Sequence, residues 1–158
     1  MPRRPIGKIK SSTGSLVWRY GGRRASGIGA AIVVLGAFPA WWTLGGAGIP
    51  EITGSAFDSY GAIGFFAALA TLAILVAPDA LDADLPIDRW PVHLLLVSAA
   101  SIALVVAAAS TAVTAVSSDT SLSVVFGFTR APGLWLTIVG LGIWISGVAL
   151  IIDARDER

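Results

Sequence analysis

The sequence predicts an all-α membrane protein built as a four-helix transmembrane bundle, with the N and C termini in the cytoplasm. Hydrophobic residues make up 55% of the chain and charged residues only 13%, whereas soluble domains average about 25% charged residues. Long apolar segments without Asp, Glu, Lys or Arg alternate with short polar connectors. Lys and Arg are concentrated in every second connector, as in multi-pass membrane proteins. The lipid bilayer is therefore the expected solvent for most of the chain.

Residues 1–24 are predicted to form a basic cytoplasmic arm that contains no acidic residue. A Lys or Arg near an anionic leaflet contributes about 1 kcal/mol, so the arm is expected to contact the inner leaflet. Arg19, Arg23 and Arg24 are the candidates for docking to lipid or to a partner. A secretory signal peptide is the alternative, but the apolar run that follows is of spanning length. Nucleic-acid binding is not expected, because the arm has no recognisable fold.

The 25–152 region is predicted to be the transmembrane domain, and its first span covers about 25–44. In this span Gly29 and Gly36 are one heptad apart and share a face, while Pro39 is expected to bend the helix. Residues 45–59 are predicted to be a flexible loop. The second span is expected over about 60–77, with Pro78 ending it.

The central span is predicted over 90–116, which contains no Asp, Glu, Lys or Arg. At about 1.5 Å per residue it is long enough to cross a hydrocarbon core of roughly 30 Å. Small side chains recur along it every four residues at Ala99, Ala103 and Ala107. Small residues let two helix backbones approach closely in lipid, so this track is a candidate packing or partner interface.

The fourth span is predicted over 131–152 and carries Gly133, Gly140 and Gly147 at heptad spacing, a second candidate interface. Before it, 121–128 is rich in alternating β-favouring residues and is expected to form a short strand in the second extracellular loop. Residues 153–158 are expected to be a charged cytoplasmic tail. With this assignment nearly all Lys and Arg lie on one side, which predicts a multi-pass protein with both ends in the cytoplasm. The expected location is the bacterial cytoplasmic membrane.

The residues that carry chemistry are sparse. The absence of ionisable residues from the four predicted spans argues against a proton relay, an ion-coupled transporter or a voltage sensor. His93 is interpreted as an interfacial imidazole; a haem shared with another subunit stays open as an alternative. Asp82 and Asp84 form a D-x-D string that could hold a divalent cation, but a solvated acidic loop facing the basic arm is favoured. No cofactor or metal is expected.

Serine and threonine hydroxyls occur within the spans and allow two interpretations. They could line a channel, or they could bond back to carbonyls of their own helix, which is the favoured interpretation.

Several short stretches resemble the small four-span integral membrane proteins of actinobacteria, most of which are described only as hypothetical membrane proteins. The stretches are 39–42 (PAWW), 55–58 (SAFD), 121–123 (SLS), 126–128 (FGF) and 133–135 (GLW). The resemblance implies a four-helix bundle with two short extracellular loops and no established activity.

The expected function is that of a non-catalytic accessory or assembly subunit of a larger bacterial membrane complex. A respiratory oxidase and an ABC-type lipid importer would both accommodate such a subunit, with other integral membrane subunits as its partners. The alternative is a small homo-oligomeric channel or transporter. An enzyme that uses the acidic 79–88 loop is a third and weaker hypothesis, so the chain is not expected to be an enzyme.

Overall fold

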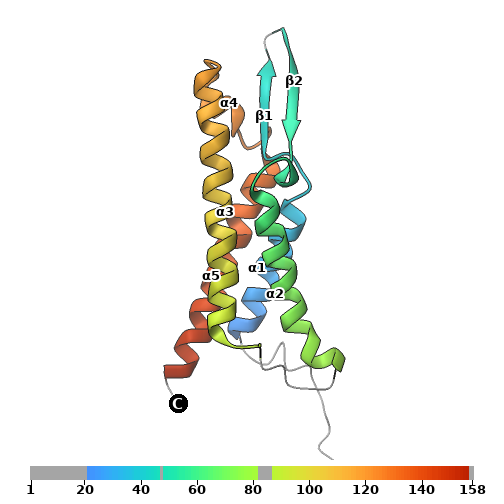
Figure 1. Ribbon diagram of the computed structural model, residues 1–158, viewed down its shortest axis with the longest axis vertical. Coiled ribbons are helices and arrows are strands. Elements are labelled where there is room, and N and C mark those ends of the chain that lie inside the picture. The colour runs from blue at the N-terminus through green and yellow to red at the C-terminus, as the bar shows by residue number, and fades with distance from the viewer. Residues whose placement is uncertain (1–20, 47, 82–86, 157–158) are drawn as a thin grey trace, which may run out of the picture.

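The computed structural model describes residues 21–46, 48–81 and 87–156. The chain is mostly helical, and one β-hairpin interrupts the helices (Figure 1). In order, the elements are α1 (Gly21–Gly36), β1 (Trp42–Gly46), β2 (Ile49–Gly54), the 3-10 helix η2 (Ala56–Asp58), α2 (Gly61–Leu81), α3 (Trp90–Ser117), α4 (Leu122–Val125) and α5 (Pro132–Asp156).

Three of the helices are long and apolar enough to cross a membrane, so the chain has the character of a membrane protein. Their apolar segments are Gly61–Pro78 in α2, Trp90–Ser117 in α3 and Pro132–Asp153 in α5. The remaining long helix, α1, has 16 residues. Such a helix is about 24 Å long, which is shorter than a hydrocarbon core of roughly 30 Å.

Helix α1 ends at Gly36 and does not continue to residue 44 as predicted from the sequence. Pro39 explains the early end, because a proline disfavours helical geometry in the residue before it. The chain after the helix is irregular, and several of its backbone groups are paired with other segments. Ala40 O accepts from Gly133 N at 2.9 Å, and Trp41 N donates to Gly54 O at 2.7 Å.

The prediction of a flexible loop over 45–59 is wrong, because β1 and β2 form an antiparallel hairpin there. The register pairs Trp42 with Gly54 and Leu44 with Ile52, and a bulge follows Leu44. Gly45, at the bulge, adopts a φ of +100°, a backbone conformation that glycine tolerates without strain.

The short strand predicted over 121–128 is also wrong: this segment forms the single-turn helix α4. Val124 N donates to Ser121 O at 3.0 Å, and Phe126 N donates to Leu122 O at 2.9 Å. The hydroxyls of Ser121 and Ser123 lie 2.8 Å apart at the start of this turn.

The other helix bounds differ less from the predictions. Helix α2 passes through Pro78 and ends at Leu81, because a proline in the last turn removes only one hydrogen bond from the helix. Helix α3 covers Trp90–Ser117 and agrees with the predicted 90–116. Helix α5 continues to Asp156, so most of the predicted charged tail is helical.

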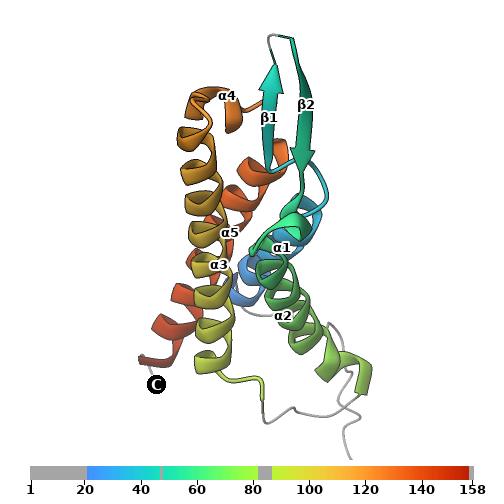
Figure 2. The ribbon, with the colours of Figure 1, turned by 45° about the horizontal axis from the view of Figure 1, so that its top comes forward.

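The helices run between two distinct ends of the molecule (Figures 1 and 2). The start of α1, the end of α2, the start of α3 and the end of α5 lie at one end, which we call the terminal end. The hairpin and α4 lie at the other, and the hairpin stands beside the last turns of α3. We call this the hairpin end. The core between them is built mainly from alanine and valine of all four long helices around the fully buried Trp144.

Candidate functional site

The glycines predicted to form interfaces on the first and fourth spans lie against each other in the structure. α1 and α5 form the most extensive helix contact of the chain. A Cβ atom added to Gly29 would lie 2.7 Å from Gly140 O, and one added to Gly36 would lie 3.1 Å from Gly133 O. At the terminal end, a Cβ on Gly22 would lie 2.9 Å from Gly147 O.

Three glycines at heptad spacing on α1 therefore meet three on the antiparallel α5. Because these contacts are between backbones, no side chain fits between the two helices without moving them apart. The glycine faces are occupied within the chain itself, and they are not free to receive another subunit.

The alanine track predicted on α3 is only partly buried. Ala103 and Ala107 are buried, whereas Ala99 is half-buried. The close approach of α3 to α2 uses a neighbouring residue, since a Cβ on Gly64 would lie 3.9 Å from the Cβ of Ala100. The opposite face of α3 exposes large apolar side chains, including Leu95 and Val105, which is the surface that a lipid-facing helix presents.

A charged cluster joins α1 to the start of α3 at the terminal end. Arg23 Nη2 lies 2.6 Å from Asp88 Oδ2, and His93 Nε2 donates to Asp88 Oδ1 at 2.9 Å. The side chain of His93 is only 1% exposed. Burial by itself raises the pKa of Asp88, but the hydrogen bonds from His93 and Arg23 and their charges outweigh it and hold this pKa below its ordinary value.

This cluster accounts for one of the predicted docking residues. Arg23 is paired with Asp88 inside the chain, Arg24 is exposed on α1, and Arg19 lies outside the described residues. Asp82 and Asp84 of the D-x-D string also lie outside them. Within the described ranges, no three His, Asp or Glu side chains are grouped so that they could hold a metal ion.

The hairpin is attached to the segment before α5 by both side-chain and backbone groups. Thr43 Oγ1 donates to Arg130 O at 2.8 Å. The Arg130 guanidinium in turn donates to Gly45 O at 3.4 Å and pairs with Glu51 at 2.9 Å. Thr43 is buried, while Ile52 on the second strand is 62% exposed. The hairpin is therefore fixed at its base and presents one strand outward.

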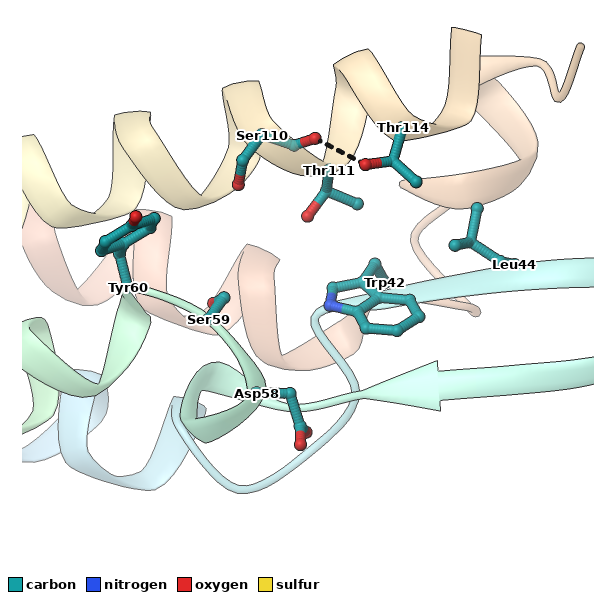
Figure 3. A pocket seen from close by; sticks show the side chains of 8 residues that line it. All are labelled: Trp42, Leu44, Asp58, Ser59, Tyr60, Ser110, Thr111 and Thr114. Carbon is teal, nitrogen blue, oxygen red and sulfur yellow. Dashed lines mark hydrogen bonds between the residues drawn. The ribbon is translucent and has the colours of Figure 1, made fainter. Parts of the chain in front are cut away.

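A cleft of about 260 Å³ opens between this hairpin, the start of α2 and the last turns of α3 (Figure 3). Trp42 and Leu44 line it from the hairpin side, and Ser59 and Tyr60 line it from the turn between η2 and α2. The third wall is formed by three hydroxyl residues of α3, which are Ser110, Thr111 and Thr114.

Most hydroxyls in the helices bond back to their own helix, as the favoured interpretation of the sequence predicts. Thr71, Ser101, Thr137 and Ser146 each donate to a carbonyl four residues earlier, at 2.8–3.1 Å. In the cleft wall, Thr111 and Thr114 do the same, and Ser110 donates to a carbonyl three residues earlier. These bonds use the hydroxyl protons but leave oxygen lone pairs available in the cleft.

Two groups of site residues were not found from the sequence. The first is the Arg23–Asp88–His93 cluster, although a histidine five residues after an aspartate at the start of an apolar span is a usable signal. The second is the cleft, because its walls come from segments that are distant in sequence and only the hairpin brings Trp42 to face α3.

Comparisons of the chain with protein-family models, with curated proteins and with solved structures found no match. The functional argument therefore depends on the geometry of the chain itself.

Proposed function

We propose that the chain is a non-catalytic accessory subunit of a larger bacterial membrane complex, and that it contacts its partner through the β1–β2 hairpin. The anchored hairpin is the observation that carries the proposal. It extends beyond the end of α3 (Figure 1), and its base is held by Thr43 and Arg130. An element that is rigid at its base and exposed along one strand is suited to recognition.

The two-stranded sheet also favours contact with another protein. Each strand has one edge without a strand partner in the described part of the chain, and an extended segment of another protein can add to such an edge through main-chain hydrogen bonds. The exposed Ile52 adds an apolar side chain to this surface. The glycine faces of α1 and α5 do not take part, because they contact each other.

The proposal includes four membrane crossings, with the start of α1 and the end of α5 both in the cytoplasm of a bacterial cell. The irregular 37–41 segment after α1 would complete the first crossing. Irregular backbone at membrane depth is tolerated where protein covers it and its polar groups are paired. The bonds of Ala37, Ala40 and Trp41 to Val34, Ala56, Gly133 and Gly54 satisfy four of the backbone groups of this segment. Arg23 and Arg24 at the terminal end favour the cytoplasm for this end.

Site-specific photo-crosslinking in the native membrane tests the proposal. A photoreactive amino acid at position 52 or 53, on the outward strand, is expected to give covalent adducts with one integral membrane protein. The matched control is position 105 on α3, whose side chain is 66% exposed on an apolar face. This position is expected to give lipid adducts alone.

Two results would contradict the proposal. Adducts only to lipid at all three positions would remove the partner. Adducts that join two copies of this chain would support the alternative of a homo-oligomeric channel or transporter, which conductance measurements in liposomes would then examine.

A further inference from the structure

The cleft between the hairpin and α3 is formed by residues of this chain alone. Its volume is about 260 Å³, slightly below the roughly 300–1,000 Å³ typical of sites for drug-sized ligands. A ligand of one ring fits this space. The cleft opens at the hairpin end, where α3 reaches its last turns (Figure 3).

The walls of the cleft offer both donors and acceptors of hydrogen bonds. On α3, Ser110 and Thr111 donate to Ala107 O at 2.9 and 3.0 Å, so their oxygens remain as acceptors. On the other side, the Trp42 indole N–H and the Tyr60 hydroxyl are donors that no hydrogen bond among the described residues uses. Figure 3 shows the indole nitrogen of Trp42 and the hydroxyl of Thr111 directed toward the space between the walls.

The charge of the cleft excludes strongly ionic ligands. Among the described residues that line it there is no Lys, Arg or His, so these walls offer no cation to an anionic ligand. Asp58, a charged residue of the described lining, accepts from Ser55 N at 2.7 Å and from Ser55 Oγ at 2.9 Å. These bonds lower the pKa of Asp58, and Figure 3 shows its carboxylate turned away from α3.

The indole of Trp42 gives the cleft an apolar wall. Gly54, its cross-strand partner, has no side chain, and a Cβ there would collide with the indole ring. The ring therefore lies against the β2 backbone at Gly54, and Trp42 also lines the cleft. An aromatic wall beside hydroxyl acceptors matches a molecule that has an apolar C–H face and hydroxyl groups at its edge.

We propose that this cleft binds a neutral polyhydroxylated ring, a sugar, packed on Trp42 and hydrogen-bonded to Ser110 and Thr111. A sugar hydroxyl both donates and accepts, so it can use the α3 oxygens and the Trp42 and Tyr60 donors together. The ring can belong to a free saccharide or to the headgroup of a glycolipid, because both present the same chemistry at this position.

NMR of the indole N–H resonance of Trp42 tests the proposal on the full chain in phospholipid nanodiscs, free of sugar-based detergents. The resonance is assigned by its loss in Trp42→Phe. Methyl β-glucoside in solution and a monoglucosyl diacylglycerol in the nanodisc are the two probes. A saturable shift with the first assigns a free saccharide, and a shift with the second alone assigns a glycolipid headgroup.

Thr111→Val removes one acceptor while keeping the shape of the side chain. Loss of one hydrogen bond of about 1.4 kcal/mol corresponds to about tenfold weaker binding. The matched control is Ser146→Ala, because Ser146 also bonds back to its helix, at 2.8 Å from Gly142 O, but lies outside the cleft. The affinity of Ser146→Ala for the sugar probes is expected to stay unchanged. No shift with either probe, or equal affinity in wild type and Thr111→Val, would overturn the proposal.

Discussion

The glycine contact between α1 and α5 makes a quantitative prediction for Gly29→Ala. A Cβ at this position would lie 2.7 Å from Gly140 O and also 2.7 Å from Trp144 Cα. Ordinary van der Waals contact begins at 3.4 Å, and the backbone N of Trp144 lies closer still to this Cβ, so the two helices must separate locally by at least about 0.7 Å. Overpacking of this kind costs about 1–3 kcal/mol.

Gly142→Ala is the matched control for this substitution. Gly142 lies on α5 as well, but a Cβ there meets nothing within 4 Å. Both substitutions gain the same helix propensity, about 1 kcal/mol, so this contribution cancels when the variants are compared. Gly29→Ala is therefore expected to be less stable than Gly142→Ala by about 1–3 kcal/mol.

Unfolding in mixed detergent micelles, followed by circular dichroism, measures this difference. Equal free energies of unfolding for the two variants would refute the reasoning, because they would mean that α1 and α5 do not approach through Gly29.

Three further predictions concern the two ends of the molecule. Asp88→Asn is expected to lower the free energy of unfolding at neutral pH by about 1–3 kcal/mol, since Arg23 and His93 lose an ionised partner. The pKa of Asp88 lies below its ordinary 3.8, so this contribution is present above that value and lost as the pH falls through the lower folded-state pKa. The free energies of unfolding of wild type and variant, measured against pH, should therefore converge only below about pH 4. A difference that disappears at higher pH would contradict the low pKa of Asp88. Arg130→Gln is expected to change global stability by less than about 1 kcal/mol, while hydrogen exchange of the hairpin amides accelerates and that of α2 does not. In the chain without cysteine, Thr53→Cys is expected to react with an impermeant maleimide in intact cells, and Asp153→Cys only after lysis. Labelling of both in intact cells would contradict the proposed topology.

The helical plan of the molecule was predictable from the sequence, because it depends on hydropathy and on local spacing. The bounds of α3 follow from one uninterrupted apolar run. The heptad glycines indicated which faces of the first and fourth spans pack closely. They did not indicate that the two faces pack on each other, because spacing defines a face but not its partner, and the contribution of Gly22 was missed.

The end of α1 and the hairpin do not follow from hydropathy, because the apolar run over 25–44 continues past the local turn signals. Hydropathy alone predicts that Pro39 bends a continuous helix, whereas α1 ends before it, at Gly36. The predicted first span includes Thr43 and Leu44, while the predicted loop includes the β-favouring residues after Gly48. The two strands of the hairpin are therefore assigned to different elements. The cleft depends on this hairpin, so its residues were not identified as a site either.

Purification of the tagged chain from its native membrane in a mild detergent, followed by mass spectrometry, most directly tests whether it is a subunit of a larger complex. We predict that wild type co-purifies with larger integral membrane subunits in fixed stoichiometry. We also predict that Ile52→Asp, a substitution at a 62% exposed position, loses them while remaining folded. Recovery of the chain alone, or only as a homo-oligomer, would contradict the proposal.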